Sequence, residues 1–131
     1  MTLTNAVVPE MTRQGWGRIV NVTTSLGTML NAGNPTYGPS KAALEALSAI
    51  MAKDLEGTGF TVNVLVPGGA TSMPMISDEA GFDRAQLIQP EVMAATLVWL
   101  VSDAAGKVTG RRFLDVHWAP SLPPEQAAER R

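Results

Sequence analysis

Tyr37 and Lys41 are the two residues of this 131-residue chain whose types and spacing most clearly allow chemistry. Positions four apart share one face of a helix, so the phenol and the ammonium can converge on one small volume. A free tyrosine keeps its proton up to a pH of roughly 10, and a nearby cation stabilises the phenolate and lowers that pKa. The pair therefore predicts a proton donor and acceptor that works near neutral pH.

Three segments around this pair predict the elements that position it. Residues 18–24 and 60–66 are rich in β-branched side chains, which predicts strands buried on both faces. Residues 37–55 carry alanine, leucine, isoleucine and methionine around nearly the whole circumference of a helix. Such a helix is usually packed on two sides, here against a sheet and against another helix or subunit. Residues 25–36 contain glycine and proline and predict a loop.

Shorter elements are expected on either side of this centre. Residues 3–12 have near-helical apolar spacing, although Pro9 suggests a kink or a late start. Residues 70–88 are of mixed polarity and predict a mobile segment with short helical pieces. Proline opens a helix over residues 90–102, and a last strand is expected at 112–117.

The order of these elements predicts an α/β fold. Strands that alternate with helices build a parallel sheet with right-handed crossovers and helices on both faces. Ligands bind beyond the carboxyl ends of such strands. The ends here are Thr23-Thr24-Ser25 and Pro67-Gly68-Gly69, so we expect them to border one crevice with the start of the tyrosine helix.

Composition narrows the classes of function. With 45% hydrophobic and 17% charged residues, the chain reads as a soluble, cytoplasmic globular protein. A net charge of -2 gives no electrostatic reason to expect nucleic acid or a membrane as a partner. The sequence has no cysteine, and His117 is its only histidine, so we expect no metal site.

Several short motifs, in their order and spacing, resemble the C-terminal half of a short-chain dehydrogenase/reductase. The motifs are Gly17-Arg18-Ile19-Val20-Asn21-Val22, the hydroxyl cluster after it, Tyr37-x-x-x-Lys41-Ala42-Ala43, Val62-Asn63-Val64 before Pro67-Gly68, the Pro90-Glu91 helix, Ser102-Asp103-Ala104-Ala105 and Thr109-Gly110. The resemblance covers about residues 1–118. It implies part of a Rossmann-like domain, the C-terminal half of a doubly wound parallel sheet in three α/β/α layers. Residues 119–131 are expected to form a flexible tail.

The resemblance implies hydride transfer between NAD or NADP and an alcohol or carbonyl. By resemblance, Tyr37 exchanges the proton with the substrate oxygen, and Lys41 lowers its pKa and binds the nicotinamide ribose. The family's active hydroxyl lies about thirteen residues before the tyrosine, which is Thr24, with Ser25 beside it. Adjacent side chains on a strand point to opposite faces, so one of the two should face the crevice. The spacing favours Thr24, and Ser25 stays open if the strand has ended.

The resemblance also implies where the nicotinamide would lie. Pro67 and Gly68 would pass along it, and Ala70 and Ser72 would contact its carboxamide. The family's Gly-x-x-x-Gly-x-Gly turn, which binds the pyrophosphate, does not occur in this sequence. We therefore expect the first four strands, the dinucleotide cradle and the residue that selects NAD or NADP to be missing. The last strand also departs from the family, because Asp115 is not followed by glycines.

Two functions follow from this reading. The first is an NAD(P)-dependent oxidoreductase of the short-chain type, with a small alcohol or carbonyl substrate that the sequence does not specify. The second is a non-catalytic remnant that acts only by association with another chain, because half of such a sheet exposes an apolar strand edge. In the family the tyrosine helix contributes to a dimer interface, which predicts a homo-oligomer through the helix Tyr37–Leu55.

Overall fold

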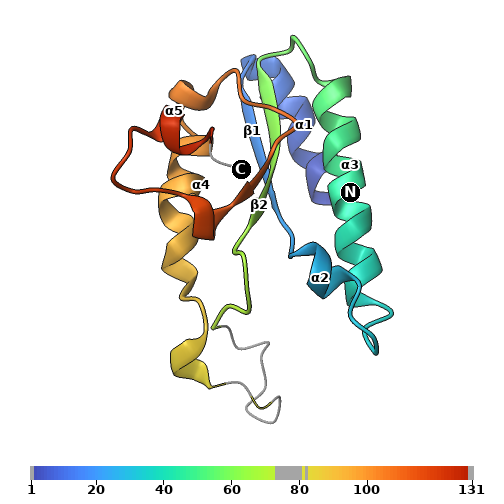
Figure 1. Ribbon diagram of the computed structural model, residues 1–131. Coiled ribbons are helices and arrows are strands. Elements are labelled where there is room, and N and C mark those ends of the chain that lie inside the picture. Colours follow the sequence, from blue (N-terminus) through green and yellow to red (C-terminus); the bar gives the residue numbers. More distant parts are fainter. Residues whose placement is uncertain (1, 73–80, 82, 130–131) are drawn as a thin grey trace.

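A computed structural model describes residues 2–72, 81 and 83–129 of the chain, coloured from blue to red in Figure 1. Part of the segment 70–88, which we expected to be mobile, lies outside these residues. The helices and strands are α1 (Thr2–Gln14), β1 (Gly17–Val22), α2 (Leu26–Met29), α3 (Tyr37–Asp54), β2 (Phe60–Val66), α4 (Ala94–Leu100), β3 (Arg112–Leu114) and α5 (Pro124–Ala127). Short 3-10 turns are η2 (Arg84–Gln86), η3 (Pro90–Met93), η4 (Asp103–Ala105) and η5 (Asp115–His117).

The three strands form one parallel sheet in the order β1-β2-β3. Helices α1 and α3 cover one face, and α4 and α5 lie on the other face (Figure 1). The predicted α/β fold with helices on both faces of a parallel sheet is therefore confirmed. Within the described residues, no helix combines the length and the apolar character that crossing a bilayer requires.

Strand β2 is the centre of the sheet, and all of its residues are buried. Its Leu65 belongs to the hydrophobic core between the sheet and α4, together with Trp99, Leu100, Ala105, Phe113 and Ala128. Strand β1 differs from the prediction, because its residues are mostly half-buried and Val22 is 44% exposed. In the described structure β1 pairs only with β2, so one of its edges lies open.

The last strand is shorter than residues 112–117. It ends at Leu114, which pairs with Val66, the last residue of β2. Pro67 follows and has no N–H to extend the ladder, so the chain turns into η5 instead. The helix predicted over residues 90–102 also divides, with η3 preceding α4.

The residues after Trp118, which we expected to be a flexible tail, include the short helix α5. Ala127 and Ala128 are each 2% exposed, and Arg111 donates a hydrogen bond of 2.6 Å to the Ala128 carbonyl oxygen. These contacts place α5 against the sheet face that α4 covers. The flexibility of the segment stays a prediction.

Asp115, the first residue of η5, is 2% exposed. Within the described residues, neither of its carboxylate oxygens has a hydrogen-bond partner. The Thr96 hydroxyl of α4 favours the charged form only weakly, since it lacks the geometry of a hydrogen bond. Burial dominates and raises the pKa of Asp115 to about 6.

This burial predicts a pH-dependent stability that Asp115→Asn should remove. A carboxyl whose pKa is higher in the folded than in the unfolded state destabilises the fold as pH rises through the folded value. The wild-type free energy of unfolding should therefore fall between about pH 4 and pH 6, by on the order of 3 kcal/mol. Urea unfolding at several pH values measures this slope. An equal slope in Asp115→Asn would show that another group causes it.

Gly38, the second residue of α3, lies where α2 packs against the first turn of that helix. A Cβ at this position would collide with the backbone carbonyl oxygen of Met29. The close approach of α2 therefore requires glycine here, and it fixes the start of α3 and with it Tyr37.

Gly38→Ala should destabilise the protein by about 1–3 kcal/mol, because the backbone of α2 must move away. Gly27→Ala is the matched control, since Gly27 is also helical and an added Cβ meets nothing within 4 Å. The control should be neutral or slightly stabilising. Thermal unfolding distinguishes the two, and equal losses would contradict the packing argument.

Candidate functional site

The carboxyl ends of β1 and β2 lie together at one edge of the sheet, as the sequence predicted. Val22 pairs with Leu65 in the parallel register. Beyond β1, the Thr23 N–H still donates a hydrogen bond of 3.0 Å to the Leu65 carbonyl oxygen. The chain therefore leaves the sheet at the same edge after both strands, at Thr24 beyond β1 and at Pro67 beyond β2.

Tyr37 and Lys41 occupy the first two turns of α3, next to this edge. The Lys41 Nζ lies 5.7 Å from the centroid of the Tyr37 ring. It also donates a hydrogen bond of 3.1 Å to the carbonyl oxygen of Val22, the last residue of β1. The structure thus brings the phenol, the ammonium and the strand end together, while the catalytic roles of these residues stay predictions.

Three consecutive hydroxyl residues follow β1, and the fold uses two of them. The buried Thr23 hydroxyl donates to Glu45 Oε1 at 2.6 Å. The Ser25 hydroxyl caps α2, where it accepts from the Thr28 backbone N–H at 3.2 Å. Among the described residues, the Thr24 side chain has no hydrogen-bond partner. The geometry therefore favours Thr24 over Ser25 as the hydroxyl that is free to meet a ligand.

The turn after β2 contains the residues that we expected beside a nicotinamide. Gly68 has φ +98°, and a Cβ there would collide with Val116 of η5, so glycine is required. Further along, Ala70 accepts from the Ile88 N–H at 2.9 Å, and the Ser72 N–H donates to the Ile88 carbonyl at 2.8 Å. These bonds occupy the Ser72 backbone N–H, and its hydroxyl has no partner within residues 2–72, 81 and 83–129. Contacts to a carboxamide stay a prediction.

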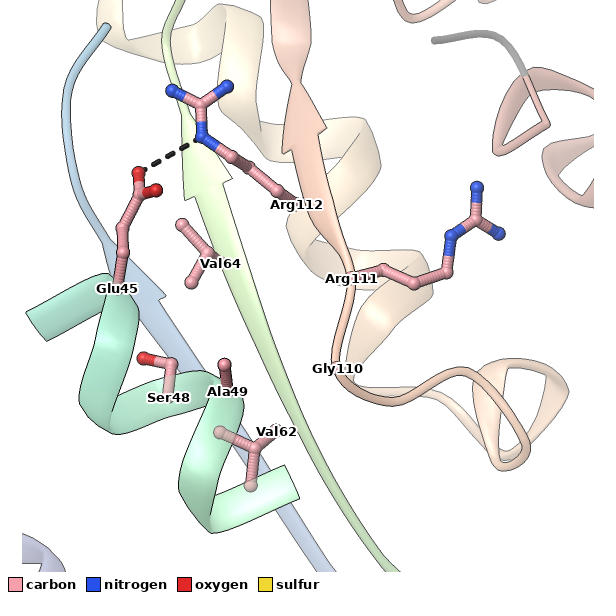
Figure 2. Close-up of a pocket in the computed structure, with 8 residues that line it drawn as sticks. All are labelled: Glu45, Ser48, Ala49, Val62, Val64, Gly110, Arg111 and Arg112. Atoms are coloured by element: carbon pink, nitrogen blue, oxygen red, sulfur yellow. Dashed lines mark hydrogen bonds and ion pairs between the residues drawn. The ribbon is translucent and has the colours of Figure 1, made fainter. Parts of the chain in front are cut away.

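Two charged residues that the sequence analysis did not single out lie next to these groups. Arg112 of β3 donates from Nε to Glu45 Oε1 at 3.0 Å, as Figure 2 shows. It also donates from Nη2 to the Thr24 carbonyl oxygen at 3.0 Å. Glu45 lies four residues after Lys41, so helical spacing could have placed it on the same face of α3. Arg112 gives no comparable signal, because its partners are distant in the sequence.

A cavity of about 140 Å³ opens between α3 and β3, beside this ion pair (Figure 2). Its lining residues are Glu45, Ser48, Ala49, Val62, Val64, Gly110, Arg111 and Arg112. Neither Tyr37 nor Thr24 lines it, so it is separate from the group of residues predicted to do chemistry.

Comparison with known sequences gives the same family along most of the chain. Residues 1–80 match the sequence profile described as short chain dehydrogenase. The chain is 34% identical over 116 residues to a 3-oxoacyl-(acyl-carrier-protein) reductase of Pseudomonas aeruginosa, covering 82% of this chain and 47% of the relative. It is 32% identical over 119 residues to an acetoacetyl-CoA reductase of Cupriavidus necator, covering 85% and 48%. The chain thus spans about half the length of the curated relatives it matches.

Solved structures give the same result for the fold. A short chain dehydrogenase from Salmonella enterica serovar Typhi matches with a TM-score of 0.77 and 27% identity, over 86% of this chain and 46% of that one. A putative NAD(P)-dependent gluconate 5-dehydrogenase from Beutenbergia cavernae, with bound NADP, matches with a TM-score of 0.71 and 28% identity, over 86% and 49%. The sequence profile, the curated relatives and the solved structures all point to one family. The chain belongs to the short-chain dehydrogenase/reductase family.

Proposed function

We propose that this chain carries the proton-transfer half of an NAD(P)-dependent oxidoreductase that interconverts an alcohol and a carbonyl. The observation that supports it is the contact of Lys41 with both the Tyr37 ring and the end of β1. This contact brings a proton donor and a cation to the end of β1, two residues before Thr24, at the sheet edge where ligands of parallel sheets bind. We also propose that the protein is located in the cytoplasm.

Each residue has a separate part in this proposal. In the direction of reduction, the Tyr37 hydroxyl gives its proton to the substrate oxygen, and in oxidation the phenolate takes it back. The positive charge of Lys41 stabilises the phenolate between these steps. The Thr24 hydroxyl donates to the same substrate oxygen and orients the carbonyl. A bound nicotinamide supplies or accepts the hydride.

The residues at the edge fit the nicotinamide half of a dinucleotide. Gly69 and Ala70 are exposed, and Gly69 has no side chain while that of Ala70 is a single methyl group, so a flat ring can approach the turn after β2. Ser72 offers a hydroxyl without a partner among the described residues. The sequence has no Gly-x-x-x-Gly-x-Gly turn for the pyrophosphate, and the choice between NAD and NADP stays open.

The relatives suggest a first substrate class to test. A 3-oxoacyl-(acyl-carrier-protein) reductase and an acetoacetyl-CoA reductase are each named for a 3-oxoacyl thioester. We therefore propose such thioesters as first test substrates, with acetoacetyl-CoA as the simplest.

A second candidate is a non-catalytic chain that acts only by association. The open edge of β1, with Val22 exposed, favours it, because unpaired edges are sites where another chain can bind. Fluorescence titration with NADH and NADPH separates the two functions. Saturable binding supports the oxidoreductase, and no binding by the purified protein supports the second candidate.

Tyr37→Phe should lower kcat/KM for acetoacetyl-CoA by about 100- to 10,000-fold, because it removes the proton that the carbonyl oxygen must receive. Thr24→Val keeps the shape of threonine without its hydroxyl and should also lower the rate, whereas Thr24→Ser should keep most of it. The loss of NADPH absorbance measures all three. Ser25→Ala compares the neighbouring hydroxyl, and a larger loss in Ser25→Ala than in Thr24→Val would reverse the assignment.

The outer surface of α3 supports the proposed homo-oligomer. Ala42, Ala43 and Ala46 are exposed there, and Ile50 is 56% exposed. Small and apolar side chains at helical spacing let another helix approach closely. We propose that a second copy of the chain packs on this surface of α3.

Ile50→Glu should shift the protein from oligomer to monomer, because it would bury a charge without a partner. Val98→Glu is the matched control, since Val98 of α4 is 67% exposed on the other side of the sheet. Sedimentation velocity measures both variants. Dissociation by Val98→Glu alone would place the interface on α4.

A further inference from the structure

The last residue of β1 and the two residues after it are each held by a different charged side chain. The contacts are Lys41 Nζ to the Val22 oxygen (3.1 Å), Thr23 Oγ1 to Glu45 Oε1 (2.6 Å) and Arg112 Nη2 to the Thr24 oxygen (3.0 Å). We call these three charged side chains the strand-end clamp. One lysine, one glutamate and one arginine thus fix three successive residues, the last of which is the proposed active threonine.

The clamp continues the row of residues that begins at Tyr37. Tyr37, Lys41 and Glu45 follow one another at intervals of four residues, so they lie along one face of α3. Arg112 comes from β3, where it pairs in register with Val64 of the central strand. Its side chain therefore crosses β2 to reach both α3 and β1, as Figure 2 shows for its contact with Glu45.

Thr24 depends on the clamp because the sheet no longer holds it. In the part of the chain that the structure describes, the last backbone bond of this edge runs from the Thr23 N–H to the Leu65 carbonyl oxygen. For the Thr24 carbonyl, Arg112 supplies the contact that a strand partner would otherwise make. Holding this carbonyl restrains the Thr24–Ser25 peptide plane and, through it, the backbone that carries the Thr24 side chain.

We propose that Arg112 and Glu45 are positioning residues that orient the Thr24 hydroxyl toward the oxygen served by Tyr37. This inference rests on the proposed function of Tyr37 and Thr24. The Arg112 side chain is 34% exposed and the Glu45 side chain 26%, and solvent-accessible ion pairs contribute little to stability. We therefore expect the clamp to set the position of Thr24 and to add little to the stability of the fold, so variants of Arg112 should still fold.

Arg112→Lys is the decisive variant, because lysine keeps the charge but has all its donors on one nitrogen. It cannot reproduce the two separate donors, Nε and Nη2, with which arginine reaches Glu45 and the Thr24 carbonyl oxygen. Arg111→Lys is the matched control. The Arg111 side chain points away from Glu45 (Figure 2) and binds the Ala128 carbonyl oxygen instead. Circular dichroism and thermal unfolding first establish that both variants are folded.

The first readout is the orientation of Thr24, measured by three-bond couplings to its methyl carbon in isotope-labelled protein. We expect a single χ1 rotamer in the wild type and in Arg111→Lys, and averaged couplings in Arg112→Lys. Glu45→Gln, as a second variant, should also change the Thr24 couplings, because it weakens the anchor of Arg112. Unchanged Thr24 couplings in folded Arg112→Lys would overturn the proposal.

The second readout is the steady-state kinetics of the variants. Together with the couplings, it distinguishes a failure of the clamp proposal from a failure of the proposed function. Arg112→Lys should lower kcat on the order of 10- to 100-fold while KM for the dinucleotide stays the same. A loss confined to KM would assign Arg112 to binding and contradict a positioning role. If the wild type shows no reductase activity, the proposed function fails, whereas the couplings still decide whether the clamp orients Thr24.

Discussion

The complete burial of β2 is the constraint on which the remaining structure depends. Because helices cover both of its faces and strands pair with both of its edges, the positions of β1 and β3 are set by their register with it. Its buried Asn63 amide adds a tie to the loop before β3, donating to the Val108 oxygen at 2.7 Å and accepting from the Arg111 N–H at 3.2 Å. The same register brings the ends of β1 and β2 to one edge, beside the start of α3.

The sequence predicted well the parts that local pattern controls. The helix expected at 37–55 runs over Tyr37–Asp54, and the strand expected at 60–66 runs over Phe60–Val66. The sequence predicted less well where β3 ends and how deeply β1 is buried. Both properties depend on the strands and helices that pack next to an element, and not on its own residues. The strand expected at 112–117 stops where β2 stops, and β1 is half-buried because one of its edges is open. In the site, Tyr37 and Lys41 followed from helical spacing, but the contacts of Arg112 span 67 and 88 residues and leave no local pattern.

The acidic residues on the two faces of the sheet differ in their hydrogen-bond partners. On the α3 face, Glu45 is partly exposed and accepts from both a hydroxyl and a guanidinium. On the α4 face, Asp115 is buried, and the Thr96 hydroxyl and the Trp99 indole nitrogen are also buried without partners among the described residues. Unsatisfied buried polar groups reduce stability, so this side carries a cost that the α3 side avoids. The satisfied carboxylate lies next to the proposed chemistry, where fixed geometry matters most.

The reach of Arg112 has a consequence for the order in which the molecule forms. Its bond to Thr24 closes a loop of 88 residues, which is the kind of non-local contact that forms late in folding. During synthesis the tyrosine helix and the first strand emerge long before the arginine that ties them to the third strand. An incompletely folded or nascent chain would therefore contain the tyrosine and the lysine without a fixed threonine. Such a chain would hold the proposed proton donor before the hydroxyl proposed to orient the substrate, so the complete proposed site would exist only in the finished fold.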